Sequence, residues 1–288
     1  MRVHRYTSFL LLLPWPWVCA NRAAPAQPET AAQAVVQRAL ANELLAARSA
    51  GHPIRYTLRK TSPRLTSTKL LIETKDGLVA RLVSINDQAL SAADNKKELD
   101  RLDGLLADPG RQKHRKDSED ADTARAMKVL RALPGAFLYQ PADPDPAAPA
   151  GQAPLMRFTF SPNPAFDAPD LETEVLKEMT GEVWVDPAQA RVTRLEGHLR
   201  RDVDFGWGIL GKLNKGGWIV IEQADIGGGQ WHIVRFEMQM TGRVLFKSRV
   251  FDTVEVESDF VPVPLGLSYQ KAIEMLRASE APQERASH

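Results

Sequence analysis

The segment Gly206–Gly211 matches the glycine pattern of dinucleotide-binding loops, G-x-G-x-x-G. Such a loop holds a pyrophosphate where it opens a helix whose amino terminus faces the phosphate groups. Here four residues separate the match from a second glycine pair and the next strand-like run, so no helix fits. We therefore predict a long hairpin loop, whose apolar residues include Trp207, Ile209 and Leu210. Such a loop is typical of a lid over a cavity, a partner contact or a membrane contact, and packing on the protein's own core is the alternative.

The residue types that ligate metals or catalyse reactions are scattered along the sequence. The histidines are His4, His52, His114, His198, His232 and His288. No two of them are spaced as on one helix face around a metal, no G-x-S-x-G elbow occurs, and the single cysteine is Cys19. Acidic residues such as Glu182 and Glu222 alternate with apolar ones, as on the solvent face of a sheet. We therefore predict no metal, no cofactor and no enzymatic activity.

Charge and composition exclude several classes of protein. Lysine and arginine number 37 against 36 aspartate and glutamate, which leaves a net charge of +1 and no basic surface for nucleic acid. Hydrophobic residues make up 43% of the chain, as in globular proteins rather than disordered ones. The longest apolar stretch is too short for a helix that spans a bilayer. The 288 residues therefore indicate a globular protein without a nucleic-acid partner.

The amino terminus is typical of a secretory signal peptide. Two arginines precede the apolar run Phe9–Ala20, and small residues follow at Ala24–Ala26. We therefore predict a signal peptide over residues 1–26 and export to the periplasm. Attachment of a lipid at Cys19, as in outer-membrane lipoproteins, is the less favoured alternative, because Val18 is larger than the residue that normally precedes such a cysteine.

The amino-terminal half predicts a helix, a set of strands and a helical insert. Thr30 and the periodic apolar residues after it predict a capped helix that ends near Gly51. Three strand-like runs follow at Ile54–Thr61, Ser67–Thr74 and Leu78–Asn86, with a hairpin turn at Lys75–Gly77. Residues 91–154 form an insert of two helices parted at Asp108–Gly110, then a proline- and alanine-rich loop.

The carboxyl-terminal half is rich in strands with short connections. Its strand-like runs are Leu155–Pro162, Glu182–Asp186, Arg191–Asp202, Gly217–Ile226, Trp231–Met240 and Val244–Glu257, with a short helix at Leu171–Met179. No proline occurs from Ala188 to Val261, as expected of paired strands, and the connections are too short for the crossover helices of a parallel sheet. This half therefore predicts an antiparallel meander.

About nine strands with several helices predict an α+β fold. We expect one strongly curved antiparallel sheet, an open half-barrel, with helices on its concave side. A single domain would cover residues 27–277, with the helical insert and its loop at 91–154, and a disordered tail would follow at 278–288. Two domains that divide at the proline-rich loop are the alternative.

Large apolar residues gather in the meander and suggest a binding interior. A curved sheet that few helices cover leaves an apolar cavity open on one side, and such cavities hold acyl chains. The candidate ligand-binding residues are Phe158, Phe160, Trp184, Trp218, Trp231 and Met238. Adjacent strand residues point to opposite faces, so some of the six must lie on the other face. Packing within a filled core is the simpler role for each of them.

The order of these segments resembles the exported lipoprotein-carrier superfamily. The resemblance is carried by IETKDGLVARLVSINDQALS (72–91), WVDPAQARVTRLEGHL (184–199) and MTGRVLFKSRVFDTVEVE (240–257). These segments are similar to LolA/LolB-like outer-membrane lipoprotein-sorting proteins and RseB/MucB-type sensor domains, and most of all to an uncharacterised bacterial branch. The resemblance implies a periplasmic carrier that shelters an acyl chain of a lipid or an acylated protein, by burial rather than chemistry.

The alternative function is a non-catalytic envelope sensor or protein-interaction module. Its barrel would be filled with side chains, and its helical insert would bind another envelope protein. Peripheral contact with a membrane is compatible with both functions. An open apolar interior favours the carrier, a filled interior favours the module, and a polar, titratable interior would indicate an enzyme.

Overall fold

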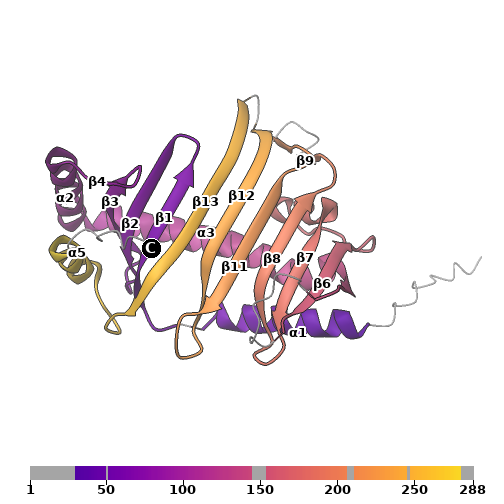
Figure 1. The fold of residues 1–288 in the computed structure, drawn as a ribbon. Helices are drawn as coiled ribbons and strands as arrows, with labels where there is room; N and C mark the ends of the chain where they lie inside the picture. Colours follow the sequence, from indigo (N-terminus) through magenta and orange to yellow (C-terminus); the bar gives the residue numbers. More distant parts are fainter. Residues whose placement is uncertain (1–29, 50, 145–153, 206–210, 245–246, 280–288) are drawn as a thin grey trace, which may run out of the picture.

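The computed structural model describes residues 30–49, 51–144, 154–205, 211–244 and 247–279 (Figure 1). The predicted signal peptide at 1–26, with Cys19, lies outside these ranges. Outside them too are the loop residues Trp207, Ile209 and Leu210 and most of the proline-rich loop and the tail. In the described part of the chain, no helix is both long and apolar enough to cross a membrane.

Thirteen strands of the described residues form one antiparallel sheet. They are β1 (Ile54–Ser62), β2 (Leu65–Ile72), β3 (Val79–Ile85), β4 (Gln88–Ala89), β5 (Phe137–Pro141), β6 (Met156–Pro162), β7 (Met179–Asp186), β8 (Arg191–Leu199), β9 (Val203–Phe205), β10 (Gly211–Leu213), β11 (Trp218–Asp225), β12 (Trp231–Val244) and β13 (Lys247–Pro262). The helices are α1 (Ala31–Ala46), α2 (Ala92–Ala107), α3 (Pro109–Ala136), α4 (Leu171–Glu174), which a 3-10 turn (Val175–Glu178) extends, and α5 (Tyr269–Ala278).

The strand order is β4-β3-β2-β1-β13-β12-β11-β8-β7-β6-β5, and β9 and β10 pair beside one end of β12. The predicted α+β class and the large antiparallel sheet are confirmed, and the sheet does not close into a barrel. The last strand, β13, returns to pair with β1 and so joins the amino-terminal hairpins to the meander. The expected count of about nine strands was too low. The unpredicted strands β4, β5, β9 and β10 have two to five residues each, too few for a visible periodicity.

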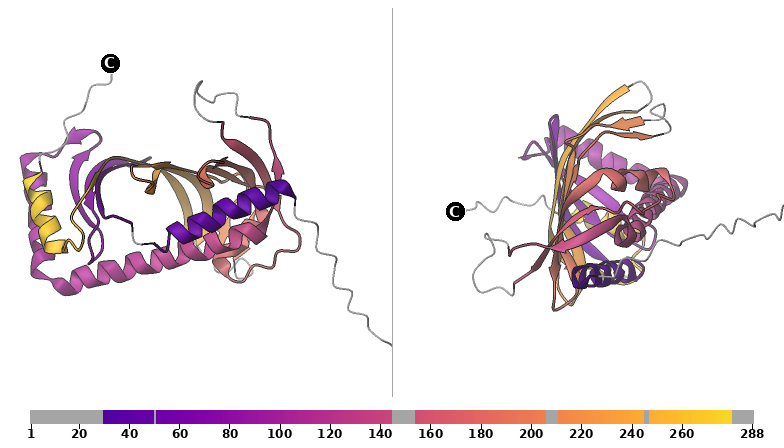
Figure 2. Two further views of the ribbon diagram at one scale, coloured as in Figure 1. Left: turned by 90° about the horizontal axis from the view of Figure 1, so that it is seen from below. Right: turned by 90° about the vertical axis from the view of Figure 1, so that its right-hand side faces the viewer.

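Figure 2 shows the sheet as an arch whose hollow side faces α1 and α3, and we call this side the concave face. Helices α2 and α5 instead pack on β2 and β3 at one end of the arch. Leu70 and Ile72 of β2 face these two helices, whereas Leu71 between them contacts Tyr56 on the concave face. The prediction of helices on the concave side is therefore corrected for α2, which covers the outer face together with α5.

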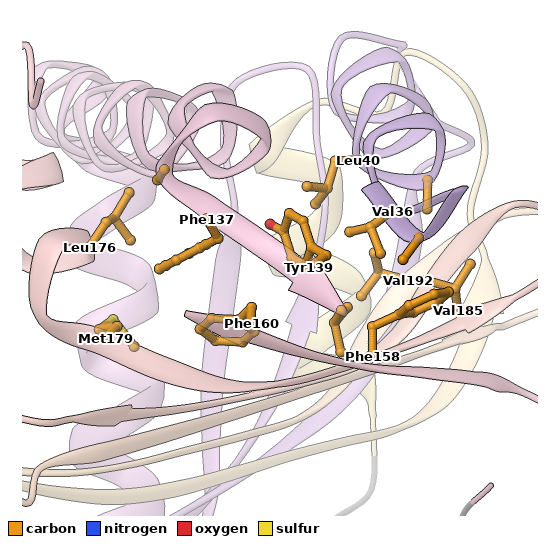
Figure 3. Close-up of a cluster of buried hydrophobic side chains, with 14 of the residues drawn as sticks. Val36, Leu40, Phe137, Tyr139, Phe158, Phe160, Leu176, Met179, Val185 and Val192 are labelled. Carbon is orange, nitrogen blue, oxygen red and sulfur yellow. The ribbon is translucent and has the colours of Figure 1, made fainter. Parts of the chain in front are cut away.

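Two of the three hydrophobic cores of the described residues stabilise the two ends of the arch. The first core lies between α1, the carboxyl end of α3 and strands β5–β8, and Figure 3 shows its side chains. The second core lies between α2, α5, β2 and β3. The labelled side chains of the first core are Val36, Leu40, Phe137, Tyr139, Phe158, Phe160, Leu176, Met179, Val185 and Val192.

Local signals explain where the helices begin. The Thr30 side chain accepts a hydrogen bond from the Gln33 backbone N–H, and Asp108 does the same for Arg111, with Pro109 in the first turn of α3. Gln33 also covers the outer edge of the sheet, because its amide oxygen accepts from the Tyr139 N–H at 3.0 Å. The edge strand β5 thereby bonds to α1 rather than exposing this donor.

Helix α5 was not predicted, although its sequence carries the usual signals. Ser268 caps it, and Tyr269, Ala272, Ile273 and Leu276 recur at helical spacing on its buried face. The buried Arg81 guanidinium donates to the Leu276 carbonyl at the carboxyl end of the helix. The expected domain boundary at residue 277 therefore falls inside a helix that runs to Ala278.

Candidate functional site

An apolar strip runs along the middle of the concave face. Directly paired residues of antiparallel strands lie on the same face, so the register identifies which side chains point toward α3. Ile221 is paired with Leu195 of β8 and, through it, with Val183 of β7, which belongs to the first core. On the other side Ile221 is paired with Phe236 of β12. We define the central strip as Ile219, Ile221, Phe236, Met238 and Met240.

The central strip is only half-buried although it lies in the middle of the sheet. Every residue of β11 is at least partly exposed. Ile219 and Met240 touch the first core, whereas Ile221, Phe236 and Met238 belong to no packed cluster of the described residues. Apolar side chains at the centre of a sheet are usually buried, so this exposure marks a surface that the fold leaves accessible.

The middle of α3 explains why the strip is accessible. Seven consecutive residues of α3, from Asp120 to Ala126, are exposed. Seven residues make almost two helical turns, so every side of the helix meets solvent there, including the side toward the sheet. The buried residues of α3 are Gln112 and Ala136, near its two ends. The helix therefore crosses the arch as a strut that is anchored at both ends and solvated between them.

A group of ionisable residues adjoins one end of the strip. Glu255 of β13 is paired with Phe236, and Glu257 lies two residues further along the same face. The Lys60 ammonium bonds the Glu255 carboxylate at 2.6 Å, and the His232 imidazole Nε2 lies 2.6 Å from a Glu257 carboxylate oxygen. The polar end of the strip is therefore built by β1, β12 and β13 together.

Burial perturbs two further groups at this polar end. Burial raises the pKa of the Glu73 carboxyl, against the opposing effect of the Ile54 backbone N–H that donates to it at 3.1 Å. Burial, and then the negative charge of Glu257, raise the pKa of the Tyr56 phenol far above its ordinary value. The Tyr56 ring contacts the His232 ring edge-on at 5.2 Å between centroids and stacks on Phe260 at 5.9 Å.

Three of the six predicted interior residues lie on the concave face. Phe158 and Phe160 are 2% and 4% exposed and pack inside the first core, with the Phe160 ring 4.5 Å from that of Phe137 (Figure 3). Met238 alone among the six lies in the central strip. The two phenylalanines therefore fill the end of the arch rather than line an open surface.

Trp184 and Trp218 lie on the outer face, which corrects their predicted place in the interior. Trp184 is paired with Arg157 and Arg194, whose guanidinium groups lie 5.5 and 5.4 Å from the indole ring centre. The Trp218 indole N–H donates to the Gln239 side chain at 2.9 Å. The alternation of strand residues places both rings on the side opposite the central strip.

Trp231 is the first residue of β12. Its indole N–H donates to the Gln189 side chain at 3.0 Å, and the Arg191 guanidinium lies 5.1 Å from its ring centre. These contacts tie the start of β12 to the turn before β8. Trp231 therefore has a local partner on each side and is not part of the strip.

Sequence reasoning missed most of the site for a clear reason. Ile219 and Ile221 alternate with Trp218 and Val220, so the strand is apolar on both faces and its sequence does not reveal which face is covered. The His232 ring of β12 contacts the Glu257 carboxylate on the neighbouring strand β13. Its position at the polar end of the strip follows from the register, which only the structure provides.

The described residues bring together no set of three or more histidine, cysteine or acidic side chains that could hold a metal ion. The fold and site define an α+β protein with an open, arched antiparallel sheet and a half-exposed apolar strip beneath a helical strut. Comparison with protein-family models, with curated proteins and with solved structures finds no match.

Proposed function

We propose that this protein is an exported, periplasmic carrier that shelters an acyl chain between the central strip and the middle of α3. The observation that carries the proposal is the half-burial of Ile221, Phe236 and Met238 opposite a solvated stretch of helix. A bound chain would cover the apolar surface that α3 leaves accessible. The mechanism is burial, without a covalent step or a cofactor.

The energy of such burial suits reversible carriage. Each buried methylene contributes about 0.8 kcal/mol, so roughly eight methylenes along the strip would contribute about 6 kcal/mol before the entropy of binding is subtracted. The flexible side chains of Met238 and Met240 suit chains of different length. A carrier needs this adaptability more than it needs a rigid pocket.

The order of segments that resembles the LolA/LolB-like and RseB-type proteins supports the same proposal. The expected cargo is a lipid or an acylated protein, and delivery implies transient contact with a membrane or with an envelope protein. A shared order of elements is compatible with several ligands, so the cargo is proposed as a class.

A second candidate function is a non-catalytic sensor or interaction module of the cell envelope. It is favoured by the first core, where Phe137, Phe158 and Phe160 fill one end of the arch with side chains. In such a module the central strip would bind a protein segment rather than a lipid, and α2 and α3 would contact the partner protein.

The matched pair Ile221→Asn and Val220→Asn tests the carrier. The two residues are adjacent and half-buried on β11 but lie on opposite faces. Titration with a fluorescent fatty acid should show at least tenfold weaker binding for Ile221→Asn and an almost unchanged affinity for Val220→Asn. Equal losses in both variants, or no binding by the unaltered protein, would contradict the proposal and favour the interaction module.

A further inference from the structure

The hairpin of β12 and β13 projects beyond the rest of the sheet at one end. Strand β1 pairs with β13 only from Val254 to Pro262, whereas β12 pairs with β13 as far as Lys247. The end of this hairpin, with β9 and β10 beside it, therefore extends past the amino-terminal strands (Figure 1). We call this end the basic tip, and it comprises residues 200–205, 211–215, 241–244 and 247–252.

The basic tip has an excess of positive charge that the composition of the whole chain conceals. It contains seven lysine and arginine residues against three aspartates, whereas the whole chain has 37 basic and 36 acidic residues. Lys212 pairs with Asp202 at 2.7 Å. Lys247 and Arg249 are exposed and make no ion pair within the part of the chain that the structure describes. The net charge gave no sign of this basic surface, because the remaining residues have an excess of acids.

Two large apolar side chains are exposed on the same hairpin. Val250 is 69% exposed and Phe251 is 38% exposed. Val250 is paired with Thr241 and Phe251 with Met240, so the two side chains lie on opposite faces of the hairpin. Exposed apolar side chains next to cations are typical of peripheral membrane contacts, where the apolar groups enter the headgroup region and the cations meet lipid phosphates. Because both faces take part, the basic tip suits contact with its end.

Phe251 joins the basic tip to the central strip. It is directly paired with Met240, the last residue of the strip on β12, so the two side chains start about 5 Å apart on one face. From Met240 the strip continues along the concave face through Met238 and Phe236. A basic tip that touches a bilayer would therefore place the end of the strip beside the lipid headgroups, where an acyl chain can enter or leave.

We propose that the basic tip docks the protein on an anionic lipid surface, so that cargo passes between the bilayer and the central strip. This inference rests on the proposed carrier function, because the docked strip receives or delivers the acyl chain. An acidic protein partner would attract the same cations. The lipid surface is favoured because it also offers an apolar medium to Val250 and Phe251 and because the central strip begins at this end.

Vesicles of phosphatidylcholine, alone or mixed equally with phosphatidylglycerol, test the docking surface. In flotation assays the whole protein should bind the anionic vesicles at least tenfold more tightly than the neutral ones, and added salt should reduce this preference. The double variant Lys247→Ala/Arg249→Ala should bind anionic vesicles roughly twentyfold more weakly, since each basic residue near such a surface contributes about fivefold. The control Lys96→Ala/Lys97→Ala removes the same charge from exposed positions of α2, at the other end of the arch, and should bind like the unaltered protein.

Binding of the fluorescent fatty acid in solution separates docking from carriage. The variant Lys247→Ala/Arg249→Ala should keep its affinity for the fatty acid, because the central strip is intact. Equal losses of vesicle binding in this variant and the α2 control, or no preference of the unaltered protein for anionic vesicles, would overturn the docking surface and leave the carrier function intact. A matching loss of fatty acid affinity would also overturn it, because the two cations would then bind the ligand's own headgroup. Failure of the unaltered protein to bind either vesicles or fatty acid would overturn the carrier function as well.

Discussion

The packed end of the arch and its centre differ although both belong to one face of one sheet. At the packed end Phe158, Phe160 and Val183 are at most 4% exposed, whereas every residue of β11 in the centre is partly exposed. The two regions have similar apolar side chains, so residue type does not explain the difference. The helices that cover the sheet explain it. Helix α1 and the end of α3 bring apolar residues to β5–β8, whereas the middle of α3 (Asp120–Ala126) has alanine, threonine and charged side chains that are all exposed.

The difference between the two regions shows how this fold keeps an apolar surface accessible without packing a helix onto it. The two cores hold both ends of the arch. The carboxyl end of α3 packs in the first core, and at its amino end the Gln112 side chain donates to the Asp76 carbonyl at 2.8 Å. The centre is therefore held open by elements that are stable elsewhere. Mutations at the ends and in the centre should then have separate effects, on stability and on binding respectively.

The largest expected effect is the loss of a packed aromatic side chain. Phe160→Ala should lower the free energy of unfolding by about 3–5 kcal/mol, because a buried ring is replaced by a cavity. Phe236→Ala in the half-exposed strip should cost roughly 1 kcal/mol. Urea unfolding followed by circular dichroism measures both, and equal losses would show that the centre is packed like the end.

The ion pair that joins α1 to β8 should give the next effect. The Glu43 carboxylate bonds the Arg191 guanidinium at 2.7 and 2.8 Å, and both side chains are almost buried. Glu43→Gln leaves the Arg191 charge without its partner and should cost about 3 kcal/mol. Glu172→Gln, at an exposed pair with Lys128, is the control and should change stability by less than about 1 kcal/mol. A similar small loss in both variants would contradict a tightly held α1.

A smaller effect should appear in the pH dependence of stability. Because burial raises the folded-state pKa of Glu73 above its ordinary value of 4.5, the folded state holds the proton more tightly than the unfolded state. The stabilisation that this proton provides is complete at a pH below the ordinary pKa of 4.5 and is lost as the pH rises through the folded-state pKa. As the pH rises from 4.5 to 7, the free energy of unfolding should therefore fall less in the Glu73→Gln variant than in the unaltered protein. Parallel unfolding profiles for the two proteins would exclude this role.

The smallest effect is expected in the middle of α3. Ala124 is exposed and Ala136 is fully buried, so the same substitution in one helix compares the two regions. Ala124→Ser should change stability by about 0.5 kcal/mol or less, whereas Ala136→Ser buries a hydroxyl group and should cost about 1–3 kcal/mol. A large loss at Ala124 in thermal unfolding would mean that the middle of α3 is covered.

The sequence predicted the elements better than the site. Periodicity, caps and turns identified α1, α2, α3 and most of the long strands, because these signals are local. The role of β5 and the place of α2 and α5 depend on contacts between distant segments. The six chosen interior residues were large and apolar, yet Trp184 and Trp218 face outward, because a strand with apolar residues on both faces gives no sign of its orientation.

The polar end of the central strip could not be predicted from the sequence for the same reason. Lys60, His232 and Glu257 lie on β1, β12 and β13, which only the strand order brings together. In the sequence each is one of many polar residues on a strand. The resemblance to exported carriers predicted an apolar interior but gave no information on a charged end.

Native mass spectrometry of the protein, gently purified from its host, tests the central claim most directly. The carrier proposal predicts a mass above that of the mature chain by one amphiphile, lost on denaturation and diminished in Ile221→Asn but not in Val220→Asn. The bare chain mass in every preparation, with no adduct after incubation with the fluorescent fatty acid, would contradict the claim that the central strip carries a ligand.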